Sequence, residues 1–299
     1  MSGAARAENR QAVPGAGARL TRLLGASSVE VSARDDAAEW LCREHLAPGS
    51  VIYINFGPRD TYQGVVAMAA RLARIGFVPV PHVAARALAG VTQLKDYLAR
   101  AVGEAGVDQI LAIAGDADTP AGPFAATQQL LMTGLFAQHG IRRIGFAGHP
   151  EPHRSVATPV LEAALASKLA LARAAGHEAV IVSQFCFEAD PILAWLQRLR
   201  AQGIDAPVRI GLAGPASVAT LAKFAVRCGI GHSIRALARG HSSLARLLVE
   251  LGPDQVVADL AAALPADAAI DGLHFFTFGG IARTAAWLAA HSTDARPPR

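Results

Sequence analysis

Short apolar runs rich in β-branched residues recur along the chain, and stretches with helical periodicity separate them. The runs predict eight strands, over 27–33, 51–56, 77–83, 109–116, 142–148, 179–185, 207–214 and 272–278. Many of the intervening stretches stop at a glycine, which is a common helix C-cap. Eight strand–helix units over about 260 residues are typical of a (β/α)8 TIM barrel of the α/β class. A doubly wound parallel sheet fits the same alternation and is the competing architecture.

The pattern also predicts how the chain divides. The stretch 126–140 is expected to be one helix, and the span 235–265 is longer than one crossover helix needs, so the seventh strand is expected to be followed by two or three helices. We predict a single catalytic barrel over 19–292, with flexible tails at 1–18 and 293–299.

Composition narrows the class of protein. The chain has 299 residues, 52% of them hydrophobic, and a formal charge of +4. Its basic residues are scattered, which argues against nucleic acid and suits an anionic small ligand. The three cysteines, Cys42, Cys186 and Cys228, show no paired spacing, so we expect a reducing compartment with no disulfide framework and no zinc site. No signal peptide or membrane span is evident, which favours a cytoplasmic protein; a homo-oligomer is compatible with these features.

Polar residues stand at or near the ends of the predicted strands. They are His82, Asp116, His149, Glu151, His153, Gln184, His274 and Thr277. In a TIM barrel the loops after the strands meet at one rim, so we expect these side chains to converge there. Simpler roles stay open for each, as a loop histidine, a turn former or a helix cap. Pro150 and Pro152 make the segment around His149 and His153 extended, so no metal site is expected there.

Glu30 differs because it lies in the middle of the first predicted strand, where both faces of the barrel wall are covered. A buried carboxylate must be paired, hydrogen-bonded or protonated. A carboxyl kept neutral by burial is what a general acid near pH 7 requires. The alternative is a structural salt bridge to an arginine of the barrel.

Over about 27–290 the chain resembles the methylenetetrahydrofolate reductase family, flavin-dependent (β/α)8 enzymes of one-carbon metabolism. The resemblance is carried by Glu30 in the first strand and by the segments PHV (81–83), AGD (114–116), HPEPH (149–153), SQFCFEADPILAWLQRLRAQGI (183–204), GLAGPASVATLAKFA (211–225) and HFFTF (274–278). No single motif is unique, but their order and spacing across eight strands are specific.

The resemblance implies a role for each matching residue near the substrate. Glu30 matches the family's general acid, which protonates the folate as its methylene bridge opens to an iminium cation. Asp116 matches a carboxylate beside the flavin and the pterin edge, where negative charge stabilises that cation. Gln184 matches an amide that binds the pterin, Phe224 matches a ring that packs on the aminobenzoyl group, and Thr277 is expected to bind substrate.

The resemblance also implies a flavin site formed by Asn55, His82, Asp116, His149, His153 and Lys168. Asn55 and His149 stand where the family has a threonine and a tyrosine, and Ala114 replaces the family's arginine. Of the polar and charged residues that hold the flavin diphosphate in the family, only Lys168 and a second candidate, Arg173, remain. FAD binding and direct hydride transfer from NADH or NADPH to the folate therefore both stay open.

The expected function is the interconversion of 5,10-methylenetetrahydrofolate and 5-methyltetrahydrofolate with NADH or NADPH. Two alternatives remain: a related barrel enzyme on another pterin or one-carbon substrate, and a non-catalytic folate-binding protein. A buried acid in the first strand favours an enzyme, because a binding protein has less need of one.

Overall fold

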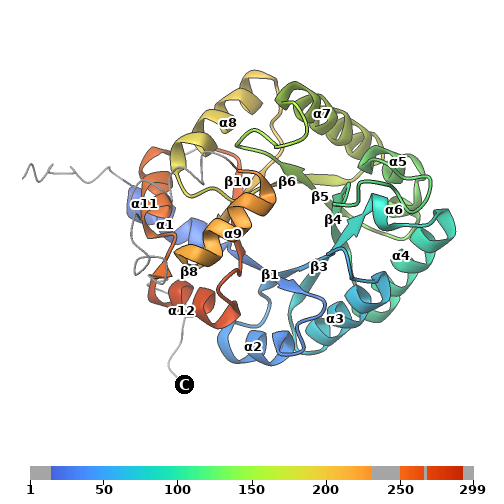
Figure 1. Ribbon diagram of the computed structural model, residues 1–299, viewed down its shortest axis with the longest axis horizontal. Coiled ribbons are helices and arrows are strands. Elements are labelled where there is room, and N and C mark those ends of the chain that lie inside the picture. Colours follow the sequence, from blue (N-terminus) through green and yellow to red (C-terminus); the bar gives the residue numbers. More distant parts are fainter. Residues whose placement is uncertain (1–14, 231–249, 266–267, 292–299) are drawn as a thin grey trace, which may run out of the picture.

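Eight parallel strands close into a barrel in the computed structural model, which describes residues 15–230, 250–265 and 268–291. Around the barrel the strand order is β1-β10-β7-β6-β5-β4-β3-β2. The strands are β1 (Ser28–Ser32), β2 (Val51–Asn55), β3 (Val78–Ala84), β4 (Gln109–Ile113), β5 (Arg143–Gly148), β6 (Glu178–Ser183), β7 (Val208–Ala213) and β10 (Ile270–Phe276). The TIM barrel is confirmed, and the doubly wound sheet is excluded because its strands do not close (Figure 1).

Helices form an outer ring around the strands (Figure 1). The described helices are α1 (Ala16–Gly25), α2 (Ala38–His45), α3 (Tyr62–Arg74), the 3-10 turn η1 (Ala85–Ala87), α4 (Val91–Ala105), α5 (Thr127–Met132), α6 (Leu135–Gln138), α7 (Thr158–Ala174), α8 (Ala189–Ala201), α9 (Val218–Cys228), α11 (Asp254–Ala263) and α12 (Ile281–His291). None of them is long and apolar enough to span a membrane.

Alternating side chains divide the barrel wall into an outer and an inner face. On β1, Val29 and Val31 join the large core between strands and helices, whereas Glu30 lies on the opposite face of the strand. On β10, Leu273 and Phe275 lie in the same outer core, and His274 between them faces β1. Each of these two strands therefore packs apolar side chains against the surrounding helices and directs a polar side chain into the barrel interior.

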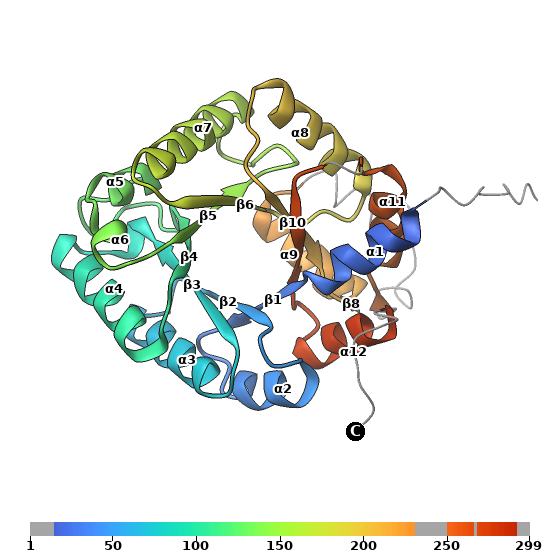
Figure 2. The same ribbon diagram turned by 180° about the vertical axis from the view of Figure 1, so that it is seen from behind.

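The two ends of the barrel are covered differently. The helix α9 lies over the end where the strands finish, and Leu221 and Ala225 of this helix pack there with Phe185 and Ala213 (Figure 1). We call this end the mouth. At the opposite end, the floor, α1 packs against β10 and α11 (Figure 2). A small antiparallel sheet of β8 (Ala216–Ser217) and β9 (Glu250–Leu251) lies beside α9.

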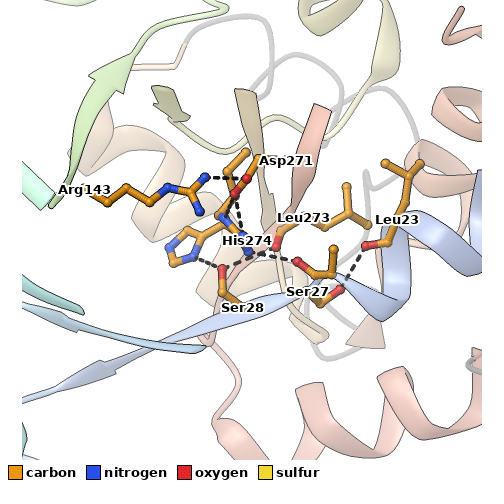
Figure 3. A network of polar contacts seen from close by, with 9 residues as sticks. Leu23, Ser27, Ser28, Arg143, Asp271, Leu273 and His274 are labelled. Atoms are coloured by element: carbon orange, nitrogen blue, oxygen red, sulfur yellow. Dashed lines mark hydrogen bonds and ion pairs between the residues drawn. The ribbon is translucent and has the colours of Figure 1, made fainter. Parts of the chain in front are cut away.

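A triad of charges, the floor triad, fills the barrel interior near its floor. Asp271 at the start of β10 pairs with Arg143 of β5 (Figure 3). It also pairs with Arg209 of β7, at 2.5 Å. The guanidinium of Arg209 also donates to the backbone carbonyl of Ala26, at 2.9 Å. Two arginines hold the pKa of Asp271 below its usual value, although burial acts in the opposite direction.

Four boundary predictions need correction. The strand expected over 109–116 ends at Ile113, so Asp116 lies in the following loop. The single helix expected over 126–140 is two helices, because the chain turns at Gly134, whose φ of 69° is a left-handed conformation. The tail expected to reach residue 18 overlaps α1, which begins at Ala16. Thr277 follows β10 instead of lying within it.

Two helices, α9 and α11, do follow β7 as expected. The rest of the predicted helical span, at 235–249, lies outside the described residues, as do 1–14 and 293–299 of the predicted tails.

Candidate functional site

Glu30 lies at the centre of a polar cluster that draws on four strands. Its Oε2 atom faces Nε2 of His82 on β3 at 3.4 Å and Nε2 of His274 on β10 at 3.6 Å. Its Oε1 atom accepts a hydrogen bond from Nδ2 of Asn55 on β2, at 3.4 Å. The side chain of Glu30 is 13% exposed, that of His82 8% and that of His274 not at all. We call these four residues the mouth cluster.

Strand register explains how residues so distant in the chain meet. In the parallel ladder Ser28 of β1 stands opposite His274 of β10, and Glu30 stands opposite Tyr53 of β2. The Tyr53 ring packs edge-on against His274, with 4.6 Å between centroids, and lies 6.3 Å from His82. Tyr53 thus supports both imidazoles. On the other side, the Thr277 hydroxyl donates to the backbone carbonyl of Glu30 at 2.6 Å, which ties the end of β10 to β1.

Three states were left open for Glu30, namely paired, hydrogen-bonded or protonated, and the contacts of its two oxygens favour the paired state in the free protein. Burial does raise the pKa of this carboxyl, but the facing imidazoles of His274 and His82 and the Asn55 amide together outweigh burial and lower the pKa below its ordinary value. Glu30 is therefore an ionised carboxylate near neutral pH. The alternative, a structural salt bridge between Glu30 and an arginine of the barrel, is not formed with Arg143 or Arg209. These two arginines pair with Asp271 at the floor.

The two histidines are neutral near pH 7. Burial lowers the pKa of His82 to about 4, although Glu30 acts to raise it. Burial also lowers the pKa of His274, against the opposing effect of Glu30. Both Nε2 atoms are buried, and neither has a hydrogen-bond partner among the residues that the structure describes. Buried polar atoms without partners are uncommon in structural cores and point to a place where a proton or a ligand is handled.

Asp116 is exposed and lies in the loop after β4. It shares the mouth with Glu30, since both carboxylates raise the pKa of the Cys228 thiol at the end of α9, after burial as the main cause. The strand β4 ends three residues before Asp116, so this carboxylate lies at the rim and not within the barrel wall. Its role beside a cation stays a prediction.

An aromatic cluster lines the mouth next to Glu30. Phe224 of α9 stacks on Phe278, with centroids 4.0 Å apart and planes 14° apart. Phe185 contacts both Phe276 and Phe278, and the Phe276 ring meets that of His274 at 4.8 Å. The expected substrate-packing ring of Phe224 is thus half-buried in a continuous apolar wall that reaches the mouth cluster.

Gln184 lies one residue beyond β6 and is half-buried. Its carboxamide oxygen accepts a hydrogen bond from the backbone N–H of Phe185 at 3.1 Å, and the backbone N–H of Gln184 donates to the carbonyl of Gly148. These contacts fix the side chain at the edge of the aromatic cluster. Pterin binding by Gln184 stays a prediction.

The remaining predicted cofactor residues form a second group, His149 and His153 in the loop after β5 and Lys168 on α7. The rings of His149 and His153 meet edge-to-face at 5.4 Å, and Nζ of Lys168 lies 5.7 Å from the centre of the Phe146 ring. Burial lowers the pKa of His149 to about 4, helped by His153 and Lys168, and lowers the pKa of Lys168 to about 8. Within the described ranges no group of three or more His, Cys, Asp or Glu side chains is arranged to hold a metal ion.

Arg173 does not join this group. It is exposed in the last turn of α7, and a helix that follows a barrel strand runs from the mouth towards the floor. The second candidate for the flavin diphosphate is therefore at the end of its helix away from the mouth, and Lys168 remains of the two.

His274 and its neighbour Ser28 are the site residues that the sequence analysis did not assign to a role. The signal was present, because His274 stands between Leu273 and Phe275 inside an apolar strand, as Glu30 stands between Val29 and Val31. A polar group inside a barrel wall needs a partner, and this holds for His274 as it does for Glu30.

Comparison with known proteins shows a similarity of fold and identifies no family. No family model matches the chain. Among solved structures, dihydropteroate synthase from Thermus thermophilus aligns over 88% of this chain and 92% of its own, with a TM-score of 0.50 and 15% sequence identity. A second structure of that enzyme, in complex with 6HMPPP, aligns over 89% and 91%, with a TM-score of 0.48 and 15% identity. At this identity the likeness concerns the barrel and leaves the chemistry to the site.

Proposed function

We propose that this protein is an oxidoreductase that interconverts 5,10-methylenetetrahydrofolate and 5-methyltetrahydrofolate, with NADH or NADPH as the hydride donor. The observation that carries the proposal is the mouth cluster, an ionised carboxylate held by two neutral histidines and an amide at the catalytic end of a TIM barrel. The aromatic wall of Phe224, Phe278 and Phe276 supplies an apolar surface for a flat, ring-containing substrate beside this carboxylate.

The reaction needs a proton as well as a hydride, and Glu30 is the proposed proton carrier. In the free protein it is a carboxylate, so it attracts the cation that forms when the methylene bridge opens. A folate that covers the mouth removes the remaining solvent from a side chain that is 13% exposed. Further desolvation raises the pKa of a carboxyl, so substrate binding favours uptake of the proton that Glu30 then delivers.

The loop carboxylate Asp116 and the amide of Gln184 would orient the pterin ring. Asp116 is exposed at the rim, where it adds negative charge beside the developing cation. Gln184 holds its amide oxygen on the backbone N–H of Phe185, which leaves the amide N–H groups as donors for a ring carbonyl or nitrogen. Thr277 ties β10 to Glu30 and would act by positioning.

A flavin is the proposed intermediary between nicotinamide and folate. The half-buried cation of Lys168, with its lowered pKa and an aromatic contact in place of a carboxylate, fits the anionic part of such a cofactor. Asn55, His82, Asp116, His149 and His153 are the other residues proposed to hold it. When bound, FAD supplies a two-electron carrier that takes hydride from one substrate and gives it to the next.

The first experiment is a visible spectrum of the purified protein followed by an assay. We expect oxidation of NADH or NADPH that depends on methylenetetrahydrofolate, and a yellow protein if the flavin route operates. A colourless protein that still turns over would support direct hydride transfer. Inactivity with both nicotinamides, with and without added FAD, would contradict the proposal, and a panel of other pterin and one-carbon compounds would then test the related-enzyme alternative.

A further inference from the structure

Ser28 contacts Nδ1 of the His274 imidazole, the ring nitrogen that does not face Glu30. Its hydroxyl oxygen lies 3.0 Å from Nδ1 of His274 and 3.3 Å from the backbone carbonyl of Leu273 (Figure 3). Ser28 is 1% exposed and His274 is fully buried, so these contacts are shielded from solvent. The two nitrogens of one imidazole thus face different partners, Nδ1 the serine and Nε2 the Glu30 carboxylate at 3.6 Å.

The single hydroxyl proton of Ser28 links these contacts. If Ser28 donates to Leu273, Nδ1 of a neutral His274 must carry the ring proton, and a bare Nε2 then faces the lone pairs of an ionised Glu30. If Ser28 donates to Nδ1, the ring proton lies on Nε2, the nitrogen that is 3.6 Å from the Glu30 carboxylate. The second arrangement replaces repulsion with a charge-assisted interaction, and the contact with Nδ1 is the shorter of the two.

We propose that Ser28 is a positioning residue that fixes the proton of His274 on Nε2, and that His274 in this form holds Glu30 as a carboxylate ready to take up a proton. The geometry of Ser28, His274 and Glu30 carries this inference for the free protein. It relies on the proposed function only in treating Glu30 as the group that carries the reaction's proton.

Other groups around Glu30 do not replace this role. His82 faces the same Oε2 atom from β3, and Asn55 faces Oε1 from β2. Tyr53 and Phe276 meet the His274 ring by their own rings. Cys228 of α9 and Asp116 add charge or potential charge at the rim, and Arg209 acts on His274 from the floor. Only Ser28, in the described part of the chain, contacts Nδ1 of His274 with a group that both donates and accepts.

The consequence is a link between tautomer and acidity. A serine that holds Nδ1 as an acceptor keeps Nε2–H on the carboxylate side, and loss of the hydroxyl frees the ring to take either tautomer. Glu30 then loses part of its stabilisation, so it takes up its proton at higher pH. The hydroxyl of a buried serine thereby affects a carboxyl that it does not touch.

The test is a nitrogen-15 NMR titration of histidine-labelled free protein, with the His274 signals identified by their loss in His274→Gln. We expect the Nε2–H tautomer of His274 to predominate in the unmodified protein. In Ser28→Ala the ratio of the two tautomers should fall about fivefold, the size of the lost hydrogen bond between neutral groups. The carboxyl carbon of Glu30, followed in protein labelled with carbon-13 at glutamate, should titrate at higher pH. Ser28→Thr, which keeps a hydroxyl, should restore both.

Ser27→Ala is the matched control. Ser27 is the preceding residue, and its hydroxyl donates to the carbonyl of Leu23 without contacting His274 (Figure 3). This variant should leave the tautomer ratio and the Glu30 titration unchanged. An Nδ1–H tautomer in the unmodified protein, or a Glu30 titration that is the same in Ser28→Ala, would overturn the inference. No substrate is used, so a failure of the proposed function would leave this result standing.

Discussion

Two carboxylates inside the barrel, Asp271 near the floor and Glu30 near the mouth, have different partners. At the floor, Asp271 pairs with Arg143 and Arg209 through short contacts, and arginine stays charged at every accessible pH. At the mouth, Glu30 faces His82 and His274 at 3.4 and 3.6 Å, and the Nε2 atoms of both histidines lack hydrogen-bond partners among the described residues. The floor triad is fully paired, and the mouth cluster is only partly so.

The difference favours a stabilising role for the floor triad and supports the proton-carrying role proposed for Glu30 in the mouth cluster. Arginine partners cannot release a proton, so the floor triad has one charge state and fixes β5, β7 and β10 together. Histidine partners can change charge, so the mouth cluster can exchange a proton when its surroundings change. Buried polar atoms without hydrogen-bond partners lower the stability of a protein, so they are found mostly where they serve a function.

The largest expected effect is on stability, at the floor. Asp271→Asn leaves two arginine charges inside the barrel without a carboxylate, so we expect the free energy of unfolding to fall by about 3 kcal/mol. Denaturant unfolding measures this change. The control Asp108→Asn removes the exposed pair with Arg142, whose side chains are 38% and 67% exposed, and should cost less than about 1 kcal/mol. Equal losses in both variants would contradict the assignment of a stabilising role to the floor triad.

The next effect is on turnover, at the mouth. Glu30→Gln keeps the shape of the side chain but removes its charge and its proton exchange, so we expect kcat to fall about 100-fold or more while folate binding persists. Steady-state kinetics and a binding titration separate the two. Glu44→Gln, on the exposed face of α2, is the control and should behave as the unmodified protein. Unchanged turnover in Glu30→Gln would remove Glu30 from the mechanism.

Much of the fold and part of the site followed from the sequence. The eight apolar runs are strong signals because strands buried on both faces have few polar residues, and each run matches a strand within a few residues. Glu30 stood out for the same reason. Its partners did not follow, because His82 and His274 meet it only through barrel closure and register, which no local pattern encodes.

The protonation of Glu30 shows most clearly what the sequence could not supply. Burial alone raises the pKa of Glu30 and so favours a neutral carboxyl, as the sequence suggested. Whether the pKa is raised or lowered in total depends on which groups face the two carboxyl oxygens, and only the atomic positions show that. The predicted end of the fourth strand was wrong for a different reason. Ala114 and Gly115 continue the apolar composition of β4 after its hydrogen-bonded ladder has ended.

A third expected effect is on the pH dependence of stability, and it arises from His82 in the mouth cluster. The pKa of His82 is lowered to about 4, whereas an unfolded histidine titrates near its ordinary value of 6.5. Between these values the unfolded chain binds a proton that the folded protein excludes, so stability falls as pH falls through this window, by about 1.4 kcal/mol per pH unit for each such histidine. His82→Gln should reduce the slope by that amount in denaturant unfolding at pH 7, 6 and 5. The same slope in His82→Gln and in the unmodified protein would contradict burial of a neutral His82.

The smallest expected effect is on substrate affinity, at the aromatic wall. Phe224 reaches the mouth from α9, and its stacking on Phe278 makes it part of a surface and not a proton carrier. Phe224→Leu keeps an apolar side chain but removes one ring face, so we expect KM for the folate to rise about fivefold with kcat unchanged, the size of one aromatic contact. Val226→Ala, 62% exposed on the same helix, should change neither constant. A loss of kcat in Phe224→Leu would mean that α9 positions the reacting groups themselves, and the division between a binding wall and a catalytic carboxylate would have to be abandoned.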